Sequence, residues 1–151
     1  MRPEAISWLI AILKTVKYLH TRLFNMSGSS SIMVVEDEKV LASLFKVFLE
    51  KMGYEAVTFT DPIMALEFIR QSTKEFSLIL TDLRMPEMSG IELAVEVRKF
   101  NGKIKIILIT AFMVEDLMLS ETFKLAKINE IVQKPVKITA LREIIDTVLQ
   151  Q

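Results

Sequence analysis

Five short segments rich in apolar residues recur along the chain after residue 31 and are predicted to be strands. They cover residues 32–35, 56–59, 78–81, 104–109 and 130–133. Most are continuous apolar runs, which are typical of strands covered on both faces rather than of strands with one wet face. We therefore expect a sheet buried between layers of helices.

Helical patterns, with apolar residues three and four positions apart, separate the predicted strands. They begin near residues 41, 62, 90, 115 and 139. Gly53 is placed to end the first helix, and Asp61 before Pro62 is a good N-cap for the second. Ser89 and Glu92 have the spacing of a capping box for the third. The fourth is predicted over about 115–127 and the fifth over about 139–149. Strands and helices that alternate in this way predict a parallel sheet with helices on both faces and right-handed crossovers.

Residues 5–24 are predicted to form a separate amphipathic helix. One face gathers the apolar side chains Leu9, Ile12, Leu13, Val16, Leu19 and Leu23. Its densest apolar part, residues 5–13, is shorter than the ~20 residues that cross a bilayer, so we expect peripheral contact with a membrane or a partner. Two alternatives remain: the helix packs on its own domain, or it precedes a true start at Met26 or Met33.

Residues 27–31, a Ser/Gly run, are expected to be a flexible linker. The sequence thus predicts an N-terminal extension over 1–26, a linker over 27–31 and one domain over 32–151, which suits a chain of 151 residues.

Composition removes several kinds of site. The chain has no cysteine and a single histidine, His20, which excludes disulfides, thiolate zinc sites, cysteine nucleophiles and multi-histidine metal sites. The net charge is zero, but residues 1–31 carry four basic residues and one acidic residue, whereas the remainder carries 15 basic and 18 acidic residues. No strongly basic face is indicated, so no nucleic-acid partner is expected. Absence of cysteine fits the cytoplasm.

Polar residues follow the predicted strands at the positions where each strand ends. Glu36, Asp37 and Glu38 follow the first strand, Asp82 ends the third, Thr110 ends the fourth and Lys134 follows the fifth. In an open parallel sheet, ligands bind beyond the carboxyl ends of the strands. Each residue alone has an ordinary explanation as a cap, a turn residue or a solvated side chain. Together they indicate one site with several carboxylates, a hydroxyl and an ammonium.

The motifs that carry these residues resemble the response regulator receiver family. They are residues 34–38, 80–90, 109–111 and 134–135, and the stretch from Asp82 to Gly90 is the most specific. The resemblance covers residues 32–151. It implies a flavodoxin-like, doubly wound, five-stranded parallel sheet in the order 2-1-3-4-5, here with an extra N-terminal helix. It also implies a stand-alone, chemotaxis-Y-like receiver of two-component signalling, because the chain ends just after its last predicted helix.

By resemblance, Asp82 accepts phosphate from a sensor histidine kinase or phosphotransfer protein. Asp37, Asp82 and the backbone carbonyl of Arg84 would hold Mg²⁺, with help from Glu36. Thr110, Ala111 and Lys134 would bind the phosphoryl oxygens, and the bond before Pro135 is expected to be cis. The protein would be a regulator and not an enzyme beyond self-phosphorylation and autodephosphorylation, and it would signal through contacts with an unidentified target protein.

Three departures from the family pattern qualify that expectation. Glu36 replaces the usual Asp, Ala126–Lys127 replaces a common Gly-Ala pair, and Ile131 stands where a switching Tyr or Phe is common. Ile131 leaves open an interaction module that does not switch. A phosphatase-type hydrolase is disfavoured, since the residue two positions after the nucleophile would be acidic and is Arg84. Arg84 and Phe112 are expected to flank the site and could shield an acyl phosphate from water.

Overall fold

The computed structural model describes residues 6–16 and 30–151. The chain divides into two units, Met1–Ser30 and Ser31–Gln151. Residues 6–16 are helical and exposed throughout, in agreement with part of the helix predicted over 5–24; the other residues of that prediction, and residues 27–29 of the predicted linker, lie outside the described part. No helix within the described residues is long and apolar enough to span a membrane.

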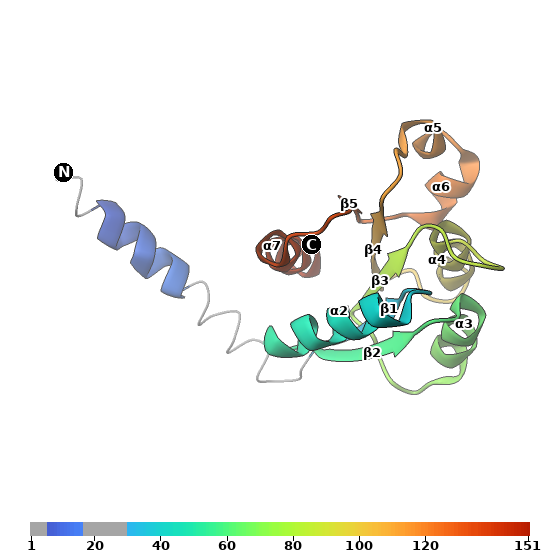
Figure 1. The fold of residues 1–151 in the computed structure, drawn as a ribbon, viewed down its shortest axis with the longest axis horizontal. Helices are drawn as coiled ribbons and strands as arrows, with labels where there is room; N and C mark the ends of the chain where they lie inside the picture. Colours follow the sequence, from blue (N-terminus) through green and yellow to red (C-terminus); the bar gives the residue numbers. More distant parts are fainter. Residues whose placement is uncertain (1–5, 17–29) are drawn as a thin grey trace. The chain divides into compact units, whose positions relative to one another are not determined.

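The larger unit is built on a parallel sheet of five strands in the order β2-β1-β3-β4-β5 (Figure 1). The strands are β1 (Ser31–Val35), β2 (Glu55–Phe59), β3 (Leu78–Asp82), β4 (Lys105–Thr110) and β5 (Glu130–Gln133). This topology confirms the predicted fold class. The order reverses at β1, whose partners are β2 and β3, so the carboxyl ends of β1 and β3 adjoin the crevice where doubly wound sheets bind ligands.

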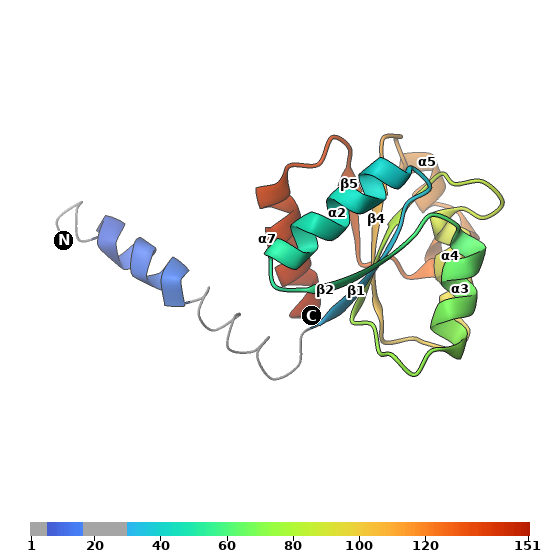
Figure 2. The same ribbon diagram turned by 60° about the horizontal axis from the view of Figure 1, so that its bottom comes forward.

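Helices cover both faces of the sheet (Figures 1 and 2). They are α2 (Lys39–Lys51), α3 (Pro62–Gln71), α4 (Gly90–Arg98), α5 (Glu115–Met118), α6 (Glu121–Ala126) and α7 (Ile138–Leu149). Helices α2 and α7 pack on one face and α3, α4 and α6 on the other.

Alternate residues of the central strands enter the two cores. In β4, Ile106 and Leu108 face α3 and α4, whereas Ile107 and Ile109 face α2 and α7. All four are at most 1% exposed, which explains why residues 106–109 form a continuous apolar run in the sequence.

The helix start and stop signals act as the sequence predicts. The Asp61 carboxylate accepts from the backbone N–H of Ile63 and Met64, and Ser89 and Glu92 form the reciprocal capping box. Gly53, after α2, has φ +94°, a conformation that glycine adopts without a Cβ penalty.

The prediction of a single helix over residues 115–127 is wrong. Two short helices, α5 and α6, replace it because Ser120 caps the second: its hydroxyl accepts from the Phe123 N–H and donates to the Leu117 carbonyl. A serine that bonds the backbone in this way competes with a continuous helix. Ser31, predicted to lie in the linker, is instead the first residue of β1 and is buried.

Candidate functional site

The polar residues singled out at the strand ends lie at one edge of the sheet. Val35 is paired with Thr81, Asp82 with Ile109, and Thr110 with Gln133. Parallel pairing in this register aligns the ends of β1, β3, β4 and β5, so the side chains that follow them converge. Backbone bonds fix the turns beyond the strands: the Glu36 N–H donates to the Phe59 carbonyl, and the Lys134 N–H donates to the Thr110 carbonyl.

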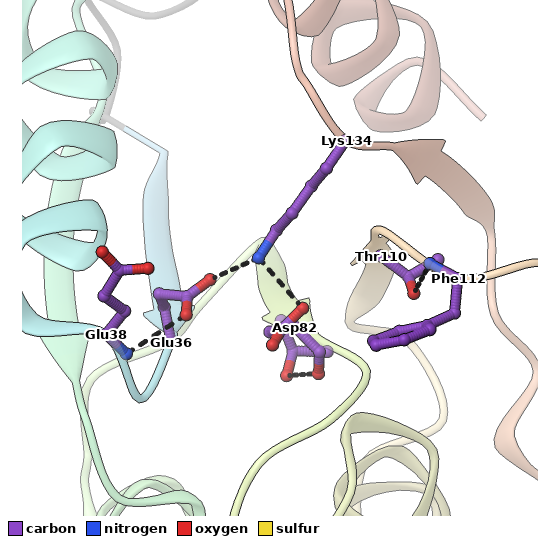
Figure 3. Close-up of polar contacts among 7 residues, drawn as sticks. Glu36, Glu38, Asp82, Thr110, Phe112 and Lys134 are labelled. Carbon is purple, nitrogen blue, oxygen red and sulfur yellow. Dashed lines mark hydrogen bonds and ion pairs between the residues drawn. The ribbon is translucent and has the colours of Figure 1, made fainter.

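Lys134 bridges two carboxylates at this edge (Figure 3). Its Nζ lies 3.1 Å from Glu36 Oε2 and 3.2 Å from Asp82 Oδ1. Glu36 is nearly buried, and its other oxygen, Oε1, accepts from the Glu38 N–H at 3.2 Å. The Lys134 ammonium therefore reaches the predicted acceptor, Asp82, from the end of β5, the outermost strand on that side of the sheet. The two residues are 52 positions apart in the sequence.

The local charges act on both partners of the Glu36–Lys134 pair. Burial raises the pKa of Glu36, and the neighbouring Asp82 carboxylate raises it further, outweighing the Glu38 N–H and Lys134, which lower it. Burial lowers the pKa of Lys134, but Glu36 and Asp82 outweigh that effect, so its pKa is above the usual value. Lys134 is therefore a permanent cation of this site at neutral pH.

Three carboxylates form a cluster suited to a metal ion. Glu36, Asp37 and Asp82 each offer an oxygen, and these three oxygens lie within 4.8 Å of one another. Asp37 is exposed and Asp82 partly buried, so the cluster opens to solvent. Carboxylates that crowd together repel unless a cation lies among them, and Mg²⁺ favours one or two carboxylates together with water and phosphate oxygens. The donor set fits that ion.

Thr110 lies on the other side of Asp82 from Glu36 (Figure 3). It is fully buried, and its Oγ1 accepts from the Phe112 N–H at 3.0 Å. The Thr110 hydroxyl hydrogen is not used by that bond and remains available to a ligand oxygen. Ala111, predicted to assist through its N–H, is exposed in the loop after β4.

Arg84 and Phe112 form a stacked pair that the sequence did not predict as a contact. The Arg84 guanidinium carbon lies 3.7 Å from the centre of the Phe112 ring, a cation–π geometry. Arg84 is two residues after Asp82 and Phe112 two residues after Thr110, so the pair joins the loops that follow β3 and β4. Both side chains are exposed.

Two remaining predicted positions lie on or after β5. The peptide bond between Lys134 and Pro135 is cis. Ile131 is paired with Leu108 across β4 and β5 and packs, partly buried, against the core under α4 and α6.

Two features that shape the site are not predicted by the sequence. One is the direct pairing of Glu36 with Lys134, since the family resemblance assigns Lys134 only to phosphoryl oxygens. The other is Glu87 in the β3–α4 loop, which has φ +68°, a left-handed conformation that is uncommon outside glycine. A single sequence carries no signal for either one, since each depends on how distant or irregular segments meet.

Comparison with known proteins places this geometry in a family. Residues 32–146 match the family described as the response regulator receiver domain. The response regulator receiver protein CpdR of Brucella abortus is 38% identical over 81 residues, which span 54% of this chain and 66% of CpdR. Ethylene receptor 2 of Oryza sativa subsp. japonica is 32% identical over 127 residues, 83% of this chain but 16% of the receptor.

Solved structures agree in fold. The response regulator protein TrrA of Thermotoga maritima, solved in complex with Mg²⁺-BeF, has a TM-score of 0.68 and 30% identity over 79% of this chain and 98% of TrrA. A receiver domain protein of Clostridium thermocellum has a TM-score of 0.72 and 23% identity, over 80% of this chain and 94% of its own.

Proposed function

This chain belongs to the response regulator receiver domain family, and on that premise we propose that it accepts a phosphoryl group on Asp82. The observation that carries the proposal is the contact of Lys134 Nζ with Asp82 Oδ1 at 3.2 Å, beside the cluster of carboxylate oxygens. A carboxylate flanked by a fixed ammonium is suited to attack phosphorus and to hold the charge that the transfer brings.

The proposed step transfers a phosphoryl group to Asp82 from a phosphohistidine of a sensor kinase or phosphotransfer protein. A bond forms between an Asp82 oxygen and phosphorus while the bond from phosphorus to the imidazole nitrogen breaks, and the electron pair leaves with that nitrogen. The product is an acyl phosphate. Phosphoryl transfer depends mainly on positioning and charge neutralisation. Lys134 would therefore neutralise part of the negative charge on the phosphoryl oxygens, and the Thr110 hydroxyl would donate a hydrogen bond to one of them. The Ala111 N–H would assist.

Mg²⁺ is the proposed cofactor, held by Asp37, Asp82 and the Arg84 backbone carbonyl. Bound there, it would neutralise charge on the acidic cluster and on the incoming phosphoryl group. Glu36 would contribute through water, because one of its oxygens is engaged by Lys134 and the other by the Glu38 N–H.

Output by protein contact in the cytoplasm completes the proposal. Receiver domains act as regulators that interact with histidine kinases or phosphotransfer proteins, and we propose that this one passes its signal on to a separate protein. Phosphorylation adds about −1.5 to −2 charge at neutral pH, which would draw Lys134 and Thr110 toward the phosphoryl group and alter the adjoining β4 and β5 loops.

Intact-mass spectrometry after treatment with acetyl phosphate or phosphoramidate and Mg²⁺ tests the proposal. The parent chain is expected to gain one phosphate, and Asp82→Asn to gain none. Asp116→Asn, which changes an exposed carboxylate on α5, is the matched control and should gain phosphate like the parent. An unmodified parent chain, or an adduct that survives in Asp82→Asn, would contradict the proposal. Chelation of Mg²⁺ should suppress the adduct.

A receiver-like module that does not switch is the alternative favoured by Ile131. A branched aliphatic side chain packed against the α4–α6 core cannot make the rotamer change of an aromatic ring. Hydrogen exchange on the phosphorylated sample separates the two functions. Altered exchange in β5 and α7 supports a switch, whereas an adduct on Asp82 with unchanged exchange there supports the alternative.

A further inference from the structure

The helix over residues 6–16 has an apolar surface that the receiver function does not use. Its large apolar side chains are all 45% or more exposed: Ile6, Trp8, Leu9, Ile10, Ile12, Leu13 and Val16. At 3.6 residues per turn these side chains occupy an arc of about 200° around the helix axis. The remaining sector carries Ser7, Ala11, Lys14 and Thr15.

A helix with this division is suited to a planar boundary between an apolar and an aqueous phase. An arc of about 200° is wider than the stripe of about 100° that a helix on a globular core buries. The polar sector runs the length of the described helix, so the axis would lie along the boundary and not across it. Trp8 is at the edge of the arc, next to Thr15 on the wheel, where the amphipathic indole favours the interface.

The charge of the N-terminal segment indicates which kind of surface the apolar helix contacts. Lys14 is the single charged residue between positions 6 and 16, and residues 1–31 carry four basic residues against Glu4. Residues 32–151 have an excess of three acidic residues, so a net positive charge is found only in the segment that carries the apolar helix. A surface that is apolar below and negatively charged above complements both features.

We propose that residues 6–16 bind the surface of a bilayer that contains anionic lipids, with the Leu9 side of the helix in the acyl region and Lys14 among the headgroups. The arc supplies most of the affinity, because burial of apolar area drives interfacial binding. The inference stands apart from the proposed phosphorylation, since neither Asp82 nor its partners take part.

Trp8 provides a direct readout because it is the only tryptophan in the chain. The full chain is titrated, without phosphodonor, with vesicles of phosphatidylcholine and phosphatidylglycerol and with vesicles of phosphatidylcholine alone. The indole emission is expected to shift to shorter wavelength, with stronger partitioning into the anionic vesicles. Vesicle flotation gives the bound fraction independently. Asp82→Asn should bind like the parent, so failure of one proposal is distinguishable from failure of the other.

Two variants with the same added charge separate apolar contact from electrostatics. Leu9→Glu puts a carboxylate at the centre of the arc, and Ala11→Glu puts one in the polar sector. Glutamate is a good helix former at either position. Ala11→Glu is expected to weaken partitioning by about fivefold or less. Leu9→Glu also loses the burial of a leucine and should weaken it by at least about tenfold more.

Three outcomes would overturn the inference. They are an unchanged Trp8 emission in the presence of anionic vesicles, equal losses for Leu9→Glu and Ala11→Glu, and equal partitioning into neutral and anionic vesicles. A Trp8 emission already at short wavelength without vesicles, together with a dimeric mass in light scattering, would overturn it too, since a second copy would then cover the arc.

Discussion

Arg84 and Phe112 stack on each other in the loops that follow β3 and β4, and we expect them to cover a phosphoryl group on Asp82. The Arg84 guanidinium carbon lies 3.7 Å from the centre of the Phe112 ring. The Phe112 N–H donates to Thr110 Oγ1, which holds the Phe112 backbone in place. An exposed cation–π pair contributes only about 0.5–1 kcal/mol to stability. The pair therefore adds little to the stability of the fold, and we expect its main effect to be on access of water to Asp82.

Removal of that cover should shorten the lifetime of the acyl phosphate. Phe112→Ala is expected to raise the rate of autodephosphorylation several-fold, because water gains access to phosphorus. The free energy of unfolding should change by less than about 1 kcal/mol. The decay of the phosphorylated mass after removal of phosphodonor measures the rate. Met113→Ala, at a neighbouring exposed position, is the control and should decay like the parent. Equal lifetimes for all three proteins would exclude a shielding role.

Glu36 pairs with two neighbours at once. Its carboxylate accepts from the Glu38 N–H and from Lys134, so it shares the lysine with Asp82. Its raised pKa reflects burial first and the Asp82 charge after it. A cation in the cluster would favour the charged form of all three carboxylates.

At the scale of elements, the start of α4 lies directly against the end of β3. A Cβ placed on Gly90, the first residue of α4, would lie 2.1 Å from the Asp82 carbonyl oxygen and 3.0 Å from Leu108 Cδ1. The Gly90 N–H also donates to the Leu83 carbonyl at 2.9 Å. Helix α4 thus begins directly against the backbone of Asp82, the proposed phosphoryl acceptor, and only glycine leaves enough space there.

Gly90→Ala should therefore displace either α4 or the Asp82 backbone. We expect a loss of at least about 2 kcal/mol in the free energy of unfolding and slower phosphorylation by acetyl phosphate. Far-UV circular dichroism in urea measures the first and intact mass the second. Circular dichroism is preferred because Trp8 is not in the receiver unit.

Gly102→Ala is the matched control. A Cβ there meets nothing within 4 Å, so stability should stay within about 0.5 kcal/mol of the parent. If Gly90→Ala were as stable and as readily phosphorylated as Gly102→Ala, the close contact between α4 and Asp82 would not hold in solution.

Across the whole receiver unit, Tyr54 ties the β2 side of the sheet to the last helix. Its hydroxyl donates to Asp146 Oδ1 on α7 at 2.6 Å, and the residue is 6% exposed. Tyr54 follows α2, which packs with α7 on the same face (Figure 2). This bond links segments 92 positions apart at the same core.

Burial, and then the Asp146 carboxylate, raise the pKa of Tyr54 well above its usual value. The folded state therefore holds the phenolic proton more tightly than the unfolded state. That contribution to stability is complete below the unfolded tyrosine pKa of about 10 and is lost as pH rises above it.

Tyr54→Phe should lower the free energy of unfolding by about 1.5 kcal/mol at neutral pH, since a hydrogen bond to a charged group is lost. The difference from the parent should stay constant up to about pH 10 and shrink at higher pH. Urea unfolding followed by circular dichroism at a series of pH values measures it. A double-mutant cycle with Asp146→Ala gives the coupling. No coupling, or a difference that grows above pH 10, would refute this role.

The sequence by itself determined the alternation of elements and the chemistry placed at the strand ends. Continuous apolar runs such as Ile106–Ile109 indicate strands buried on both faces, and parallel strands bring their carboxyl ends to one edge. Asp82, Thr110 and Lys134 could thus be assigned to one site from the order of strands and polar residues alone. Local signals such as Asp61 and Ser89 set helix starts because a cap needs only neighbouring residues.

Only the tertiary structure decided contacts between distant segments. The Glu36–Lys134 pair, the Arg84–Phe112 stack and the Tyr54–Asp146 bond each depend on how loops and helices pack after the sheet forms, which residue spacing does not encode. The division of α5 from α6 had a local cause in Ser120. The apolar pattern of residues 115–127 nevertheless also fits one continuous helix. The bonds that Ser120 makes in the folded chain decide that two short helices form instead.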